Sequence, residues 1–508
     1  MSFLEKYDAQ AGQPSAQVAL VSGWLRTDAR PFFAELRAHR PVLATPAFTL
    51  LSRFDDVTEV LSRPEDFSVR LNAPKMDPVV GGPFMLARDN TPVNWREKGI
   101  MQAVLRPEDL PHVRAMAGEI ADEALDAASP EGRIEAVNGL GRYVPIRMCG
   151  RYFGFPGPDL ESMYRWSKAT QSDMFKNLNN DPTVHEASVA AGQEMQAYLR
   201  QLLEEKRAAL GGESTGRQLT DALAGLLMAT RAHVAESLSR APAPPLPRLP
   251  LQIVGAARDR VIELVKNHRP PPQDVFSRLV RAYFPDEIGF DDERIMSNVA
   301  GLLIGAGETT SQAIVQVLRQ ILIRDKVRDA AIAAAPDPDT TRFDAYVWEA
   351  LRLDPINPLL FRWTERDSVV AAGTPRETTI PSGTIVFALT ASAMSDEALV
   401  ANPDEFQADR TDVRGFHFGY GHHACLGRYV GAEMILEVVR RVLLRPGVRL
   451  LPSPDGDLDF QGGPFPERFV IKFDPAGSDE PSSGTTNAMT PFEDDVADVG
   501  RVSVGARQ

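Results

Sequence analysis

Apolar residues recur at helical spacing over most of the chain, whereas segments with strand character are short and few. The clearest helical pattern covers residues 291–324, where apolar positions recur every three or four residues. Asp291 or Asp292 can cap its amino terminus, and at about 1.5 Å per residue the helix would be about 50 Å long. Residues 426–445 predict another long helix.

Strand patterns occur near the amino terminus and in the last third of the chain. Residues 47–53 and 367–390 predict extended structure, and a short helix is expected at 55–61. Residues 70–88 are rich in Pro and Gly and predict a long loop. Many helices with a small, segregated set of strands indicate an α+β fold that is mainly α.

Two segments fall outside these patterns. Residues 241–250 carry five prolines and must be extended, because proline fixes φ and lacks the backbone donor. We interpret residues 241–251 as a surface insertion, with a proline-rich ligand for another domain as the alternative. Residues 476–508 are rich in Ser, Gly, Thr and Asp and predict a disordered tail. We therefore expect one domain over residues 1–475.

Composition excludes several classes of function. The chain has 508 residues, 43% of them apolar, and a net charge of −14, which argues against a nucleic-acid partner. Two cysteines are too few to stabilise a chain of this size by disulfide bonds. No run of about 18 apolar residues is present, so no membrane span is expected. The charged amino terminus does not match a signal peptide, and we expect a cytoplasmic protein.

The segment Phe-Gly-Tyr-Gly-His-His-Ala-Cys-Leu-Gly at residues 418–427 carries the most chemical information. Its glycines permit a tight loop, and Cys425 lies where the next helix begins, a position that favours a thiolate with a lowered pKa. This pattern predicts a single axial bond from sulfur to iron. A buried free cysteine is one alternative. Another is a zinc site of His422, His423 and Cys425, although their spacing suits zinc badly.

This segment is similar to the haem-binding signature of the cytochrome P450 family at every fixed position. The resemblance implies the cytochrome P450 fold, a helical domain with a smaller β-rich region around a buried haem b. It further implies that Cys425 is the axial ligand, that Phe418 packs under the porphyrin and that His423 bonds a haem propionate. Gly419 and Gly427 would let the backbone approach the cofactor.

Glu349 and Arg352 stand three residues apart on one expected helix, and Pro403-x-x-Phe-x-x-x-Arg410 follows. Alone, such a pair is most often a solvated helical ion pair of little energetic value. Together, the two motifs resemble the conserved pair and meander of the same family. The resemblance implies that Glu349, Arg352 and Arg410 form a buried structural cluster.

The long helix contains Gly305-Ala-Gly-Glu308-Thr309-Thr. Glycines inside a helix cost about 1 kcal/mol each relative to alanine, so a bound group should justify them. Back-bonding of Thr309 to residue 305 is the simple structural explanation. The resemblance implies instead that Glu308 and Thr309 deliver protons during oxygen activation. The resemblance also implies that Ala306 lies against the haem. As the second small residue of this motif, Ala306 is a mild departure from the usual family pattern.

Two further positions resemble propionate-binding sites of the family. Arg362 follows Pro355 and Pro358, where many bacterial members place an arginine. The family's His-x-x-x-Arg reads Asn-Trp-Arg-Glu-Lys98 here, so Lys98 or Arg96 would take that role.

The resemblance implies a monooxygenase that activates O2 and hydroxylates or epoxidises an apolar small molecule, fatty acid-like or terpenoid. No nicotinamide or flavin fingerprint is present, so a ferredoxin or flavodoxin-like donor with its reductase would supply electrons. Surface arginines near the cysteine could meet an acidic partner: Arg414, Arg428, Arg440 and Arg441. Candidate substrate contacts are Met76, Phe84 and Met85.

Two other functions stay open. A relative of the same fold could use hydroperoxides, as a peroxygenase or a fatty-acid hydroperoxide isomerase, and would need no electron donor. A non-catalytic haem sensor would need neither Glu308 nor Thr309.

Overall fold

The computed structural model describes residues 1–210, 274–410 and 415–475. Helices account for most of this part of the chain, as the sequence predicts. Their bounds are α1 Phe3–Asp8, α2 Pro14–Thr27, α3 Ala29–His39, α4 Phe54–Leu61, α5 Ala73–Val80, α6 Pro92–Val104, α7 Leu110–Ala128, α8 Tyr143–Met148, α9 Leu160–Gln171, α10 Pro182–Leu210, α13 Val275–Arg281, α14 Asp292–Leu322, α15 Asp325–Ala334, α16 Thr341–Leu353, α17 Thr390–Ala393 and α18 Arg428–Leu443. Three π-helical turns adjoin them: η5 Val137–Arg142, η6 Cys149–Phe153 and η7 Ser172–Lys176.

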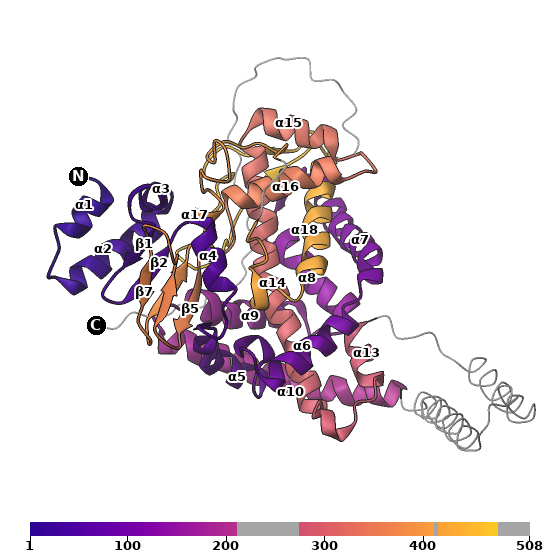
Figure 1. Cartoon of the computed structure of the whole chain (residues 1–508). Coiled ribbons are helices and arrows are strands. Elements are labelled where there is room, and N and C mark those ends of the chain that lie inside the picture. Colours follow the sequence, from indigo (N-terminus) through magenta and orange to yellow (C-terminus); the bar gives the residue numbers. More distant parts are fainter. Residues whose placement is uncertain (211–273, 411–414, 476–508) are drawn as a thin grey trace, which may run out of the picture.

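The strands form three small sheets. Their bounds are β1 Val42–Ala44, β2 Phe48–Leu51, β3 Phe67–Ser68, β4 Arg133–Glu135, β5 Leu360–Thr364, β6 Ser368–Val370, β7 Thr378–Ile380, β8 Ile385–Ala388, β9 Arg449–Leu450 and β10 Val470–Lys472. The largest sheet has the order β1-β2-β8-β5-β3, with β2 and β8 parallel and its other pairs antiparallel. The remaining sheets are β4-β10-β9 and β6-β7. Strands from distant parts of the sequence therefore meet in the largest sheet, which together with β6 and β7 forms a β-rich region (Figure 1).

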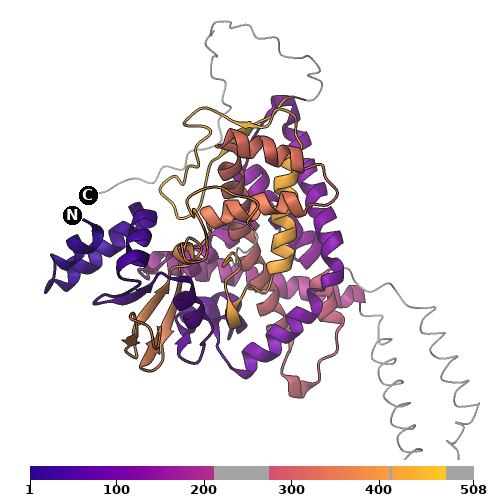
Figure 2. The same ribbon diagram turned by 45° about the horizontal axis from the view of Figure 1, so that its top comes forward.

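Helix α14 runs through the middle of the helical region, with α18 and α7 on one side of it (Figure 1). It packs against α9, α10, α16 and α18. Most of its residues are buried, because a helix in contact with neighbours on several sides can bury apolar side chains all round. The β-rich region and α1–α3 lie beside this helical region in both views (Figures 1 and 2).

The predicted long helices are confirmed, with α14 and α18 within two residues of the expected bounds. Asp291 caps α14, since its side chain accepts a hydrogen bond from the Arg294 N–H at 3.0 Å. The short strand and helix expected at residues 47–53 and 55–61 correspond to β2 and α4. Residues 367–390 form β6, β7 and β8.

The expectation of a continuous loop over residues 70–88 is wrong, because α5 occupies its middle. Pro74 lies in the first turn of α5, where its missing donor costs no helical bond. Pro78 lies inside the helix, and Gly81, with φ of +76°, ends it in the left-handed conformation. The proposed insertion at 241–251 and the tail at 476–508 lie outside the described residues.

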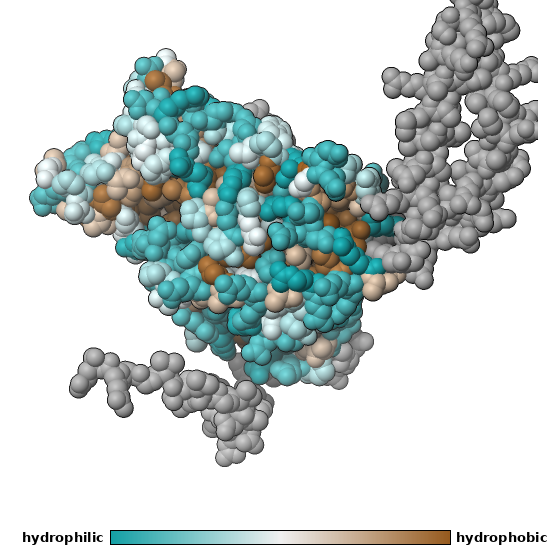
Figure 3. All heavy atoms as spheres, turned by 90° about the horizontal axis from the view of Figure 1, so that it is seen from below, coloured by the Kyte–Doolittle hydropathy of each residue, from teal (hydrophilic) through white to brown (hydrophobic). Residues whose placement is uncertain are grey.

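Polar side chains cover most of the face seen in Figure 3, with apolar side chains in scattered patches. In the part of the chain that the structure describes, no helix is long and apolar enough to cross a membrane.

Candidate active site

The cysteine loop is held in a tight backbone path just before α18. Gly419 and Gly421 have φ of +70° and +66°, a conformation that residues with a Cβ rarely adopt. A Cβ on Gly421 would lie 2.6 Å from the carbonyl oxygen of Leu61 in α4. The Cys425 N–H donates to the Phe418 carbonyl at 2.8 Å, which closes the loop. The glycines thus allow the loop to pack against α4 while it presents Cys425.

The Cys425 thiol combines solvent exposure with dense protein surroundings. The side chain is exposed, yet burial by neighbouring atoms raises the pKa of its thiol. Both observations hold if the sulfur faces open space inside the molecule. The Gly427 N–H bonds the thiol and the Arg428 charge lies nearby, and both lower its pKa. These two effects act in the predicted direction, and burial opposes them.

Open space is also found at the middle of α14. Gly305 is exposed although its helix neighbours Ile304 and Ala306 are buried. A Cβ added at Gly305, or at Gly427 beside Cys425, would meet no atom within 4 Å. Helix α14 packs against α18, the helix that follows the cysteine loop, so the two open positions lie on neighbouring elements. A flat cofactor at Cys425 would need this space.

Thr309 lies on the exposed side of α14, one turn after Gly305. Its Oγ1 donates to the Gly305 carbonyl at 2.7 Å, the back-bonding that the sequence predicts. Ala306, expected against the haem, is only 8% exposed, so Gly305 is the residue of this segment that faces open space.

Glu308 leaves α14 on a different side from Thr309 and is only 2% exposed. Both of its carboxylate oxygens lie 2.9 Å from Nε of Arg142 in η5. Burial raises the pKa of Glu308, while the Arg142 charge opposes this effect. The structure therefore does not bring the acid and the alcohol together, and their joint role stays a prediction.

Arg142 is the centre of a larger buried charge network that the sequence analysis missed. It also pairs with Glu467 at 2.9 Å, and Lys168 pairs with Glu467 at 2.7 Å. Its remaining donors reach Asn138 Oδ1 at 2.7 Å and the Pro466 carbonyl at 3.1 Å. No local motif marks Arg142, because all but one of these partners lie far from it in the sequence.

The residues expected to bind propionates surround the cysteine loop. Arg362 in β5 is 6% exposed and forms no ion pair with any described carboxylate; burial lowers its pKa to about 10. Lys98 in α6 donates to the His422 carbonyl of the loop, and burial lowers its pKa as well. His423 Nε2 lies 2.8 Å from Asp89 Oδ1, a carboxylate that the sequence analysis missed.

These groups fit haem b. A buried guanidinium without a carboxylate partner is costly unless an anion joins it, and Arg362 is such a group. Lys98 adds a second cation at the same loop, so the site offers positive charge for two carboxylates. The alternative cation, Arg96, contacts the buried Glu97 at 3.3 Å. The thiol supplies the one soft donor that an axial bond to iron needs.

Glu349, Arg352 and Arg410 form one buried cluster. Arg352 Nε lies 2.7 Å from Glu349 Oε2, and Arg410 Nε lies 3.1 Å from Glu349 Oε1. Arg352 also donates to the Pro403 carbonyl at 2.8 Å. One carboxylate therefore ties α16 to the segment that leads to the cysteine loop.

The other proposed contacts differ in outcome. Phe418 is partly buried and packs near Trp348, with ring centroids 6.0 Å apart. Met76, Phe84 and Met85 are each at most 2% exposed and belong to the main apolar core, so they line no open surface. Within the described ranges, no three potential ligand side chains come together to hold a metal ion.

Exposed aromatic side chains surround the outer face of the cysteine loop. Trp95 is 60% and Tyr429 is 55% exposed. The Trp95 ring lies 5.2 Å from that of His422, and the Arg428 guanidinium lies 4.6 Å from that of Tyr429. Arg440 and Arg441, expected to be free for a partner, instead pair with Glu437 at 2.7 and 2.6 Å. Arg414 lies outside the described residues.

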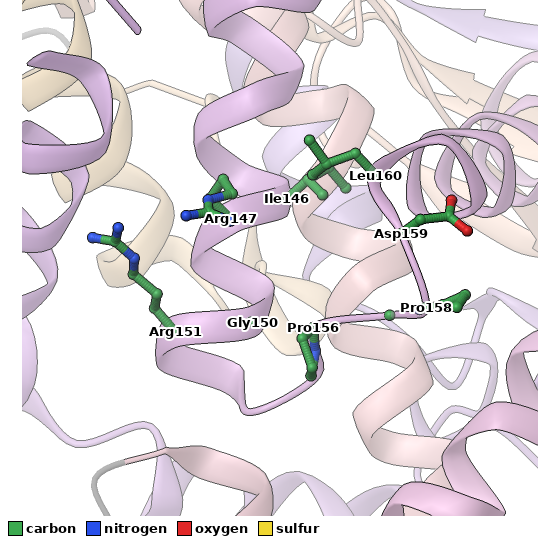
Figure 4. Close-up of a pocket in the computed structure, with 9 residues that line it drawn as sticks. Ile146, Arg147, Gly150, Arg151, Pro156, Pro158, Asp159 and Leu160 are labelled. Carbon is green, nitrogen blue, oxygen red and sulfur yellow. The ribbon is translucent and has the colours of Figure 1, made fainter. Parts of the chain in front are cut away.

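A pocket of about 360 Å³ lies away from these residues, between the α8–η6 segment and the loop before α9 (Figure 4). Ile146, which lines it, also lies near Gly307 on the side of α14 that packs against α9. The pocket therefore does not belong to the cysteine site.

Comparisons with known proteins show what the whole chain is similar to. The family model for Cytochrome P450 matches residues 339–455. The chain is 23% identical to the steroid C26-monooxygenase of Mycolicibacterium smegmatis over 470 residues, which cover 90% of this chain and 96% of the relative. It is 24% identical to the cyclomarin C epoxidase CymV of Salinispora arenicola, covering 80% and 83% of the two chains. Its fold matches CYP109Q5 of Chondromyces apiculatus with a TM-score of 0.64 at 20% identity, covering 90% and 97%.

Proposed function

The chain belongs to the cytochrome P450 family and carries haem b, and from this premise we propose that it oxidises an apolar small molecule with O2 and electrons from a separate protein. The observation that carries the proposal is the arrangement around Cys425. The exposed Cys425 thiol, the open space at Gly305 and the Arg362 guanidinium, which forms no ion pair with a described carboxylate, would together suit haem held by the thiol, with room for a small molecule beside α14.

Haem held by a cysteine thiolate supplies the oxidising chemistry, because the thiolate donates electron density that favours O–O cleavage. The protein holds and orients this group. Cys425 would hold the iron through its sulfur, to which the Gly427 N–H donates a hydrogen bond. Arg362, Lys98 and His423 would hold the carboxylates of the haem.

Thr309 provides a proton on the open side of α14. Its hydroxyl donates to the Gly305 carbonyl at 2.7 Å, and its partial exposure allows it to turn toward a molecule bound beside α14. Glu308 must first leave Arg142 before it can exchange protons with that hydroxyl. In this scheme the Arg142 ion pair controls when the acid takes part.

An electron donor would dock over the exposed aromatic patch that we define as Trp95, His422 and Tyr429. This patch borders the loop that holds Cys425, so a bound donor would be close to the haem edge. Arg428 adds positive charge beside it, which suits an acidic ferredoxin or flavodoxin-like partner.

The test uses the haem-loaded chain with a ferredoxin, its reductase and apolar substrates. We expect products that carry one oxygen atom from isotopically labelled O2, and a thiolate-ligated spectrum that Cys425→Ser abolishes. Thr309→Ala should slow product formation and release more peroxide, while the Thr309→Ser control keeps most activity.

Rapid conversion of fatty-acid hydroperoxides without any reductant, with no product from O2, would replace this proposal by the hydroperoxide-using alternative. Unchanged behaviour of Thr309→Ala, with no oxidised product under either condition, would favour the sensor.

A further inference from the structure

Lys176 is a partly buried lysine that forms no ion pair within residues 1–210, 274–410 and 415–475. It ends η7, the turn that links α9 to α10 (Figure 1). Its ammonium lies 5.6 Å from the ring centroid of Phe465, whose side chain is 1% exposed. Lys176 itself keeps some exposed surface, while burial lowers its pKa. This is the same combination that Cys425 shows, and it indicates a charge that faces space inside the molecule.

The nearest acids in the sequence are engaged with other residues. Asp173, in the same turn, lies 2.7 Å from His185 Nδ1 and 3.9 Å from Lys75 Nζ. Glu467, two residues after Phe465, pairs with Arg142 and Lys168 at 2.9 and 2.7 Å. Lys176 forms no ion pair with a carboxylate of the described residues, so it carries a charge that none of them matches.

The two segments around Lys176, η7 and the segment that contains Phe465, are both connected to α14 near Gly305. Gln171, which precedes η7, donates its side-chain amide to the carbonyl of Ile304. The Phe465 segment is tied to Glu308 through Arg142, which donates to the Pro466 carbonyl. Five residues of helical turn separate Gln171 from Lys176, on the order of 7 Å along the axis. One small molecule could therefore contact both the Lys176 ammonium and the open side of α14 at Gly305.

An ammonium that lies beside an aromatic ring and has no carboxylate partner among the described residues would select a particular kind of ligand. A lysine ammonium acts as a point charge, which suits a singly charged carboxylate. Burial around it strengthens the attraction, because less water screens the two charges. An uncharged ligand of the same shape would leave the ammonium without its counter-charge.

We propose that Lys176 binds the carboxylate of the substrate, so that this enzyme oxidises an apolar acid whose hydrocarbon part extends toward Gly305 and Thr309. This inference rests on the proposed monooxygenase function and specifies its substrate class.

The test measures binding to the haem-loaded full chain by titration calorimetry, a readout that needs no turnover. The probes are octanoic, dodecanoic and hexadecanoic acids, with the methyl ester and the amine of each. We expect at least one acid to bind about 10- to 100-fold more tightly than its ester, as a charge-assisted contact implies. Lys176→Gln should remove this preference, and Lys176→Glu should favour the amine. Lys326→Gln, a lysine change on the exposed start of α15, is the matched control and should keep it.

Equal binding of acid and ester, or no binding of either series, would overturn the inference. So would an unchanged preference in Lys176→Gln. An acid that binds through Lys176 but gives no oxidised product, while uncharged molecules are oxidised, would show that the site is not a substrate site. These results differ from failure of the proposed function, in which the chain lacks a thiolate-ligated haem or oxidises nothing with O2.

Discussion

Removing the Arg142 side chain should expose the energetic cost of the buried Glu308. In Arg142→Met, Glu308 stays 2% exposed but loses the guanidinium at 2.9 Å. Breaking a buried ion pair from one side costs about 3–5 kcal/mol of unfolding free energy, because it leaves an uncompensated charge. Glu467 keeps Lys168 at 2.7 Å and adds less to the loss.

The deficit should depend on pH, with a sign that follows from the pKa of Glu308. Burial raises that pKa above its ordinary value of 4.5, and loss of Arg142 raises it further. Between 4.5 and the raised folded pKa, the folded chain binds more protons than the unfolded chain, so stability falls as pH rises. Glu467, whose pKa Arg142 lowers, loses part of its stabilisation at every pH above its ordinary pKa of 4.5, so it adds to the loss without changing this slope. Arg142→Met should therefore be closer to wild type at about pH 5 than at about pH 8.

Urea unfolding of the haem-loaded variants, followed by circular dichroism at equal m value, measures this effect. Adding Glu308→Gln to Arg142→Met should recover a large part of the loss and flatten its pH dependence. Arg151→Met is the matched control, because Arg151 is one-third exposed in its pairs and should lose less than about 1 kcal/mol. A loss below about 1 kcal/mol for Arg142→Met, or no recovery in the double variant, would refute the reasoning.

Three other changes have expected outcomes. Gly192→Ala should lower the urea midpoint, because its Cβ would lie 2.6 Å from the backbone of Val79; Gly23→Ala, with no atom within 4 Å, should leave the midpoint unchanged or raise it slightly. Glu349→Gln should lower thermal stability and haem retention, measured by absorbance after dialysis, because it leaves two buried guanidinium groups without a carboxylate. Trp95→Ala should slow reduction by a ferredoxin in stopped-flow measurements without changing the midpoint of unfolding; equal reduction rates would contradict the docking surface.

The sequence by itself determined the elements whose pattern is local. The 3.6-residue spacing fixed α14 and α18, and Asp291 marked a helix start because its capping bond reaches only three residues. The glycines of the cysteine loop were informative for the same reason, since their positive φ angles depend on neighbouring residues. The sequence predicted a loop where α5 lies, because its prolines are compatible with either a loop or a helix that has Pro74 in its first turn.

Only the tertiary structure decided which charges meet. Arg142 and Glu308 are 166 residues apart and Asp89 and His423 are 334 apart, so no local spacing predicts either pair. The helical period of α14 determines which of its residues share a side. Only packing decided that Gly305 faces open space and that Glu308 faces the Arg142 guanidinium. A short motif can predict which side chain would hold a metal, because loop geometry is local. Whether a cation such as Arg362 or Lys176 forms an ion pair with a described carboxylate depends on every carboxylate that packing brings near it.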